Sequence, residues 1–575
     1  MLYTQLCEIY EELEKNPSRL KKTSILSAFL KKLKNEDKEV IYLIQGKVFP
    51  DYSEKEFGIS EKLAIKSLSK ASGISDKLII DKWKKLGDLG MVAEEIIKNK
   101  KQGILFSHPL TVKKVLDNLK RLPELKGKGT IEKKLSLISE LLTSATYKES
   151  KYLIRTLLQD LRVGVAEGTL RDSIVDACFY LGKDDKDDEE NKEKKKRAIE
   201  SVQEAYDKST DWKLVFEQAC KGLKDLEKIS LEPGRPVKVM LFLKENTIEK
   251  GFERVGRPCL VDFKYDGFRV MINKDEKGNI KIFTRRLDNV TAQFPDIVEY
   301  AKRHVNAKTF ILDTEAVGFD PKNKIYQPFQ AISQRIKRKY HIEKLVKELP
   351  IEINVFDLIY YNGKSFLKEP YKERRRIIEK IITTSNYKIR VSEAIITNNV
   401  KEVERFYKKA IAAGEEGIMM KNLEAPYKPG ARVGYGIKIK PEENEFDLVI
   451  TKAEYGTGRR AGWLTSYTLT CRDKDEFLEI GKVSTGLKEK VELGLSFKEL
   501  TKKLKPLIIK ESGREVEVKP KIIVTVVYQN IQKSPTYNSG YALRFPRIIR
   551  LRPDRSISDI TTLNEVKRDF KKLKR

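Results

Sequence analysis

The 575-residue chain has little cysteine, histidine, methionine or tryptophan, and it lacks long apolar runs. The five cysteines lie far apart without a CxxC pair, which excludes zinc-ribbon spacing and argues against a disulfide framework. No stretch reaches membrane-spanning length, and glutamates between positions 8 and 14 interrupt the apolar run that a secretion signal needs. We therefore expect a cytoplasmic protein in a reducing compartment, without a membrane partner.

Positive charge is abundant instead. The chain has 115 Lys and Arg against 85 Asp and Glu, a formal net charge of +30. An excess of this size favours a polyanionic partner such as nucleic acid, although a solvated basic surface is the simpler alternative. The scarcity of Cys and Met beside abundant Lys, Glu and Ile is a bias sometimes seen in proteins from hot environments.

Hydrophobic periodicity divides the chain into three parts, as its length also favours. Apolar residues from Leu2 to Leu13 recur at the spacing of one helix face, and similar stretches continue to about residue 225. Short β-type segments dominate after Pro233, and those after Pro441 have the spacing of a small barrel. We predict an all-α domain over 1–232, an α+β domain with antiparallel sheets over 233–441, and an all-β barrel of the oligonucleotide-binding type over 442–575.

The segment KYDGFR (264–269) carries the first chemical signal. A lysine ends one strand, a glycine permits a tight turn, and an arginine opens the next strand. A lysine amine attacks phosphorus only when neutral, and with an ordinary pKa near 10.4 only about one in two thousand is neutral at pH 7. The site therefore has to lower this pKa, through burial and nearby cations such as Arg269, Lys438, Lys440 or a metal ion. Taken alone, the segment also fits an ordinary hairpin.

The order of the later segments gives this lysine a context. KYDGFR is followed by FTRR (283–286), LDTEAV (312–317), NVFDLIYYNG (354–363), EGIMMK (416–421) and GIKIK (436–440). Together they resemble the motifs of covalent nucleotidyltransferases, most closely ATP-dependent DNA ligases of the archaeal and eukaryotic replicative type. The resemblance implies an adenylated Lys264 and a nucleotide site that contains Asp262, Arg269, Arg285, Glu315, Phe356, Arg432, Lys438 and Lys440.

Within that site, the resemblance implies that Phe356 stacks on adenine and that Glu315 and Glu416 lie beside a divalent metal. Two carboxylates on separate strands suit Mg²⁺, or Mn²⁺, which retains part of its water shell. Lysines two apart on a strand share a face, so Lys438 and Lys440 could both face a triphosphate. Judged singly, each has a simpler alternative: a core aromatic, an ion-pair partner, or protective charges on an edge strand.

The resemblance extends to both flanks. LQDLRVGVAEGT (158–169) is similar to the ligase DNA-binding segment, which implies backbone contacts to DNA; a helix–loop–helix corner is the alternative. RFPRIIRLRPDRS (544–556) resembles the last ligase motif, which orients pyrophosphate, and KQGILFSHPLTV (101–112) resembles a sliding-clamp binding region. The residues implied are Arg162, Gly164 and Thr169 for DNA, Arg550, Arg552, Asp554 and Arg555 for pyrophosphate, and Gln102, Leu105 and Phe106 for the clamp (PCNA).

Two positions depart from the family pattern. Gly436 stands where a tryptophan is usual, and Asp262 stands where glutamate is frequent, which leaves the choice among ATP, ADP, GTP and NAD open. The resemblance implies a monomeric ligase that seals 5′-phosphate/3′-hydroxyl nicks in duplex DNA through lysyl-AMP and DNA-adenylate intermediates, in replication, repair and recombination.

Three alternatives to a DNA ligase have less support in the sequence. An RNA ligase or capping guanylyltransferase shares the lysine motif, but a capping enzyme does not need the helical third. A non-catalytic DNA-binding or scaffold protein has no reason to keep Lys264, Glu315 and Glu416 together. An NAD-dependent ligase is disfavoured because the sequence lacks a four-cysteine zinc cluster.

Overall fold

The structure is a computed structural model that describes residues 1–53, 55–99, 109–179, 189–327, 329–338, 340–441, 444–456, 460, 462–489 and 495–573. The chain groups into two compact units, residues 1–79 with 89–440 and residues 80–88 with 441–575. The three domain boundaries expected from sequence stay a prediction. In the described part, no helix is long and apolar enough to cross a membrane.

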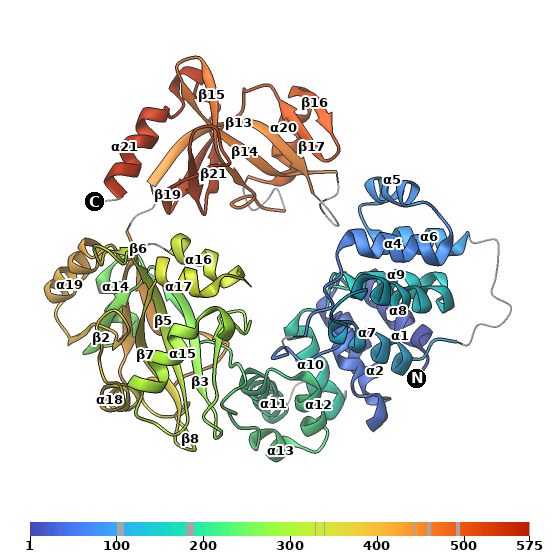
Figure 1. Ribbon diagram of the computed structural model, residues 1–575, viewed down its shortest axis with the longest axis horizontal. Coiled ribbons are helices and arrows are strands. Elements are labelled where there is room, and N and C mark those ends of the chain that lie inside the picture. The colour runs from blue at the N-terminus through green and yellow to red at the C-terminus, as the bar shows by residue number, and fades with distance from the viewer. Residues whose placement is uncertain are drawn as a thin grey trace. The chain divides into compact units, whose positions relative to one another are not determined.

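The N-terminal region is helical, as the apolar periodicity predicts (Figure 1). Its helices are α1 (Tyr3–Lys15), α2 (Arg19–Lys31), α3 (Val40–Ile44), α4 (Glu61–Ser72), α5 (Asp76–Leu86), α6 (Leu89–Lys98), α7 (Val112–Arg121), α8 (Thr130–Ser144), α9 (Tyr147–Leu157), α10 (Glu167–Cys178), α11 (Glu189–Ser209), α12 (Trp212–Ala219) and α13 (Leu223–Glu227). Helices α6 and α9 pack closely because Gly90 has no side chain: a Cβ there would lie 2.7 Å from the Lys151 carbonyl oxygen. The apolar face of α1 is buried, including Leu6, Tyr10 and Leu13.

The middle of the chain forms two separate sheets. The five-stranded sheet has the order β1-β12-β11-β2-β10, and the seven-stranded sheet has the path β4-β3-β5-β7-β8, with β6 beside β5 and β9 beside β7. All pairs are antiparallel except β1 with β12 and β7 with β9. The strands are β1 (Leu241–Lys244), β2 (Cys259–Lys264), β3 (Phe268–Lys274), β4 (Ile280–Thr284), β5 (Phe310–Phe319), β6 (Tyr326–Gln327), β7 (Ile351–Tyr361), β8 (Lys364–Ser365), β9 (Ile389–Val391), β10 (Ala394–Thr397), β11 (Gly417–Asn422) and β12 (Arg432–Ile439).

Each sheet has its own apolar core. Helices α14 (Ile248–Val255) and α19 (Val400–Ala412) pack with β2 and β11 in one core. Helices α15 (Pro295–His304) and α18 (Tyr371–Ile381) pack with β3, β5 and β7 in the other, while α16 (Phe329–Lys337) lies on β5 and α17 (Ile342–Glu348) follows it in sequence. The chain passes from one core to the other between Tyr265 and Phe268.

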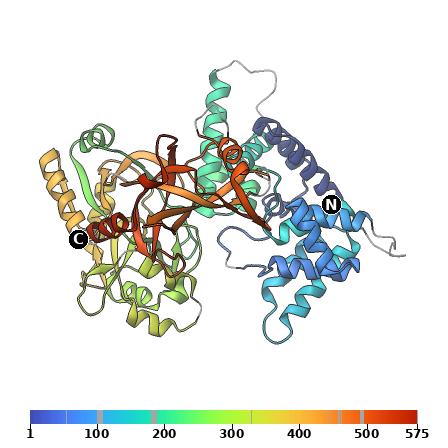
Figure 2. The same ribbon diagram turned by 90° about the horizontal axis from the view of Figure 1, so that it is seen from above.

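The C-terminal region is rich in strands, as expected. They are β13 (Asn444–Tyr455), β14 (Leu464–Asp473), β15 (Glu476–Val483), β16 (Ile508–Ser512), β17 (Glu515–Val518), β18 (Ile523–Tyr528), β19 (Asn530–Lys533), β20 (Tyr541–Arg544) and β21 (Arg547–Leu551). The long β13 pairs with β14, β17 and β18 around one core. Helix α20 (Phe497–Leu504) enters this core, and α21 (Leu563–Leu573) packs on β14 and β19 near the C-terminus (Figure 2).

Candidate nucleotide and DNA site

The turn after Lys264 joins the two sheets and is not a hairpin. Lys264 ends β2 of the five-stranded sheet, whereas Arg269 is the second residue of β3 in the seven-stranded sheet. Gly267 is required by close approach, because a Cβ there would lie 2.3 Å from the Ala316 carbonyl oxygen of β5. The hairpin that the sequence predicts is formed by the next two strands, β3 and β4. The ordinary-hairpin alternative for KYDGFR is therefore wrong.

Two adjacent glutamates hold this turn. The Glu416 N–H donates to the Lys264 carbonyl oxygen (2.8 Å), and the Glu415 carboxylate accepts the Asp266 N–H (2.8 Å). Glu415 is buried, and this burial raises its pKa to about 8. Glu415 belongs to none of the motifs found in the sequence; its place beside Glu416, just before β11, is the signal that could have found it.

The Lys264 amine shares one carboxylate with a second lysine. Both Lys264 and Lys440 form ion pairs with Oε2 of Glu416. Burial would raise the pKa of Glu416, but the two ammonium groups outweigh it and lower the pKa to about 2. Glu416 therefore remains charged and paired with both lysines.

Further cations surround this pair. Burial and the charges of Lys264, Lys440, Arg432 and Arg285 all lower the pKa of Lys438. The four cations that act on Lys438 lie on or just after β2, β12 and β4. Strand β12 lies between β1 and β11, so the edge-strand alternative for Lys438 and Lys440 is wrong. Cations that gather in this way attract an anion such as a triphosphate.

Glu315 lies on β5, half-buried and beside the same charges. Burial raises its pKa to about 8, against the opposing effect of Lys264 and Arg269, while Glu416 adds to the rise. Among the described residues, no group of three or more acidic, histidine or cysteine side chains could hold a metal ion. Two carboxylates alone suit a cation that binds mainly through water and phosphate oxygens.

A buried ion pair lies beneath the expected adenine position. Lys421 Nζ pairs with Asp262 Oδ2 at 2.5 Å and lies 4.7 Å from the centre of the Phe356 ring. The other Asp262 oxygen, Oδ1, is buried and has no hydrogen-bond partner within the described part of the chain. A buried acceptor without a partner requires a donor, which a bound ligand can supply.

Arg269 is held from several sides. Its guanidinium pairs with buried Asp313, donates to the Met240 carbonyl oxygen and lies 5.3 Å from the Phe356 ring centre. Asp313 also accepts from the hydroxyl of Tyr427 (2.6 Å). Arg269 is thus fixed by these partners and packs beside the Phe356 ring.

Gly436 has an aromatic neighbour from another strand. A Cβ at Gly436 would lie 2.7 Å from two atoms of the Phe242 ring, which belongs to β1. The ring therefore occupies the space beside β12 that a side chain at position 436 would take. The aromatic support that seemed missing in the sequence is present in the fold.

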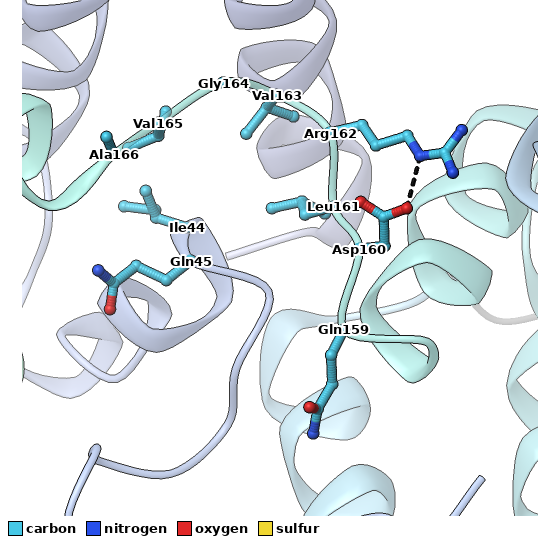
Figure 3. A pocket seen from close by; sticks show the side chains of 10 residues that line it. All are labelled: Ile44, Gln45, Gln159, Asp160, Leu161, Arg162, Val163, Gly164, Val165 and Ala166. Carbon is cyan, nitrogen blue, oxygen red and sulfur yellow. Dashed lines mark hydrogen bonds and ion pairs between the residues drawn. The ribbon is translucent and has the colours of Figure 1, made fainter. Parts of the chain in front are cut away.

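In the helical region, residues 158–166 form a loop between α9 and α10 with unusual backbone conformations. Gln159, Arg162 and Gly164 have φ of 55°, 61° and 69°. The loop and the end of α3 line a concave pocket of about 360 Å³. Figure 3 shows Leu161 and Val163 pointing toward the middle of it, whereas Arg162 extends away and pairs with Asp160 at 2.7 Å.

Beyond this loop, α10 begins with an open N-terminus. Ala166 is its N-cap residue, whose methyl group cannot accept a hydrogen bond. The guanidinium of Arg19 lies beside Gly168 in the first turn. Thr169 is 4% exposed, which favours a packing role for its side chain.

The remaining predicted residues lie elsewhere. In the C-terminal unit, Arg552 pairs with Asp447 and Asp554, Arg555 pairs with Asp447, and Arg550 pairs with Glu445. Gln102, Leu105 and Phe106 lie outside the described residues.

Comparisons with known proteins identify the family of the chain. Three family models match: "DNA ligase N terminus" over residues 2–175, "ATP dependent DNA ligase domain" over 239–440 and "ATP dependent DNA ligase C terminal region" over 460–555. The chain is 42% identical to a DNA ligase of Nanoarchaeum equitans, an alignment covering 99% of this chain and 98% of that protein. The chain belongs to the ATP-dependent DNA ligase family.

Other relatives of this ATP-dependent DNA ligase are also archaeal. A DNA ligase of Thermococcus onnurineus is 38% identical, covering 98% of this chain and 97% of that protein, and one of Methanocaldococcus jannaschii is 37% identical, covering 99% of both. The solved structure titled "Pmar-Lig_PreS3" covers 95% of the chain and 99% of its own at 17% identity, with a TM-score of 0.57, which supports the fold. Membership decides against the capping-enzyme and NAD-dependent rivals.

Proposed function

We propose that this ligase seals 5′-phosphate/3′-hydroxyl nicks in duplex DNA through a lysyl-AMP on Lys264. The observation that supports the proposal is that Lys264 ends β2 at the turn between the two sheets and that its charge, with those of Lys440, Arg432 and Arg285, lowers the pKa of Lys438. Phosphoryl transfer depends on positioning and charge neutralisation more than on acid–base groups.

Three displacements at phosphorus follow. The Lys264 nitrogen attacks the α-phosphorus of ATP, a P–N bond forms, and pyrophosphate leaves. A 5′-phosphate oxygen at the nick then attacks the same phosphorus and frees the amine. Finally the 3′-hydroxyl oxygen attacks the 5′-phosphate, the phosphodiester bond forms, and AMP leaves.

Adenine is the base that suits the unpartnered oxygen of Asp262 best. The 6-amino group of adenine is a donor for the unpartnered Asp262 Oδ1, whereas the 6-oxo group of guanine would place two acceptors together. Lys421 holds the other carboxylate oxygen, so the aspartate cannot turn away without breaking a buried ion pair. We infer a preference for ATP or ADP over GTP, with Phe356 stacking on the base.

Glu315 and Glu416 are the residues that would hold a divalent cation, Mg²⁺ or Mn²⁺, which would neutralise charge on the phosphates. Lys438 and Lys440 contact the triphosphate in this proposal, and Arg432 contacts its phosphates. The arginine cluster of the C-terminal unit, Arg550, Arg552 and Arg555 with Asp554, binds the pyrophosphate leaving group.

The helical loop supplies the DNA contact. Arg162 and the backbone around Gly164 face a phosphate, as does the open N-terminus of α10, where backbone N–H groups and the helix dipole attract anions. Such contacts do not depend on base sequence, which suits an enzyme that acts at any nick. Roles in replication, repair and recombination, a sliding-clamp partner, a monomeric state and a cytoplasmic location belong to the same proposal.

The test is adenylation with labelled ATP and Mg²⁺, followed by sealing of a nicked duplex. We expect an adduct that resists base and yields to acid, as a P–N bond does. Lys264→Ala should abolish it, while Lys302→Ala on the exposed side of α15 should leave it unchanged. An adduct that survives Lys264→Ala, or labelling by GTP at the rate of ATP, would overturn the proposal.

A further inference from the structure

The five cysteines fall into two classes. Cys7, Cys259 and Cys471 are buried in apolar cores, and burial raises the pKa of Cys259 and Cys471 to about 12 and that of Cys7 further. Cys220 is exposed and Cys178 is half-buried. Only these last two are open to a solvent reagent in the part of the chain described.

Their two sulfur atoms lie close together. Cys178 is the last residue of α10, and Cys220 is the C-cap of α12, which packs against α10. The Sγ atoms are 2.9 Å apart, about 0.9 Å more than a disulfide bond of about 2.05 Å. Little backbone movement is needed to join them.

The surroundings favour a reactive thiolate at the exposed position. The hydrogen bond from Cys178 lowers the pKa of Cys220 to about 7, and the ammonium group of Lys38 adds to this against partial burial. Lys38 Nζ lies 5.6 Å from the ring centre of Phe216, one turn before Cys220 on α12. The thiolate is the form that attacks disulfides and oxidants.

We propose that Cys178 and Cys220 are a reversible redox site that is oxidised by a low-molecular-weight disulfide such as oxidised glutathione. The Cys220 thiolate attacks one sulfur of the reagent, a mixed disulfide forms, and the first small thiolate leaves. Cys178 then loses its proton and attacks the Cys220 sulfur, which expels the second small thiol. Two protein thiols are oxidised, and one small disulfide is reduced to two thiols.

The bond would tie the C-terminal end of α10 to that of α12. Helix α10 begins directly after the loop that contains Gly164, so the cross-link acts on the element that supports the proposed DNA contact. A cross-link restricts the unfolded chain more than the folded one and therefore raises the thermal midpoint of unfolding. This inference does not depend on the ligase mechanism.

The test is exposure of the full chain to oxidised glutathione, followed by alkylation of free thiols, digestion and mass spectrometry. We expect three of the five thiols to remain free and a cross-linked peptide pair to contain Cys178 and Cys220. The thermal midpoint of the helical region should rise by about 5–10 °C and should return after reduction.

Cys220→Ser is the test variant, and Cys259→Ser is its matched control. Cys220→Ser should keep four free thiols and show no shift, whereas Cys259→Ser should still form the bond. Five free thiols after oxidation, or a stable glutathione adduct on Cys220 that Cys178 does not displace, would overturn the inference.

Discussion

The nucleotide site and the helical loop achieve their geometry in opposite ways. At the nucleotide site, charged side chains hold one another: Lys264 and Lys440 share Glu416, and Lys421 is paired with Asp262. In the helical loop, the backbone itself adopts left-handed conformations at Arg162 and Gly164. The difference fits the two proposed roles, because covalent chemistry needs fixed charges, whereas sequence-independent DNA binding needs shape and accessible N–H groups.

The largest effect should come from breaking the buried pair beneath the base. Lys421→Met leaves Asp262 charged without its partner, so we expect a loss of about 3–5 kcal/mol in the free energy of unfolding. Lys372→Met removes an exposed pair with Glu424 and should change stability by less than about 1 kcal/mol. Denaturant unfolding of both variants measures this; equal losses would contradict the distinction.

Glu416→Gln should have the next largest effect. The amide cannot balance two ammonium groups, and we expect the adenylation rate to fall about 100-fold, or roughly 2.7 kcal/mol. Glu424→Gln is the surface control. Single-turnover labelling with ATP measures the rate, and an unchanged rate would show that Glu416 does not orient the amine.

Variants of Glu415 distinguish the positioning of the turn after Lys264 from the effect of the carboxylate charge. Glu415→Ala removes the acceptor for the Asp266 N–H, and we expect kcat for adenylation to fall about 10- to 50-fold with little change in KM for ATP. Glu415→Gln keeps a carbonyl oxygen at that place and should recover most of the loss. A glutamine variant as slow as the alanine variant would refute the positioning role.

The helical loop should give the smallest effects. Arg162→Ala should weaken binding to nicked duplex less than about 10-fold and reduce the slope of log affinity against log salt by about 1. Gly164→Ala strains a residue at φ 69° and should weaken DNA binding by a similar factor. ATP labelling without DNA should be unchanged in both, and a loss of labelling would show that the two regions are not separable.

Much of this was predictable from sequence, because the relevant signals are local. The helical face of Leu2 to Leu13, the β3–β4 turn and the strands that carry Glu315 and Phe356 follow from periodicity and turn residues. The order of the motifs identified the family.

The features that could not be predicted from sequence depend on which distant segments become neighbours in the fold. The assignment of β2 and β3 to different sheets, the Glu415 contact to Asp266 and the Phe242 ring beside Gly436 join residues through strand pairing. No local periodicity encodes such pairings, since register and partner choice are fixed only when the whole sheet forms.

The passage of the chain between two apolar cores just after Lys264 has a thermodynamic consequence. A nucleotide attached there would contact both sheets, and its binding free energy would be lost if either core unfolded. Adenylation should therefore increase the cooperativity of unfolding. Two cores that unfold in separate thermal transitions without AMP would unfold in a single transition once AMP is attached.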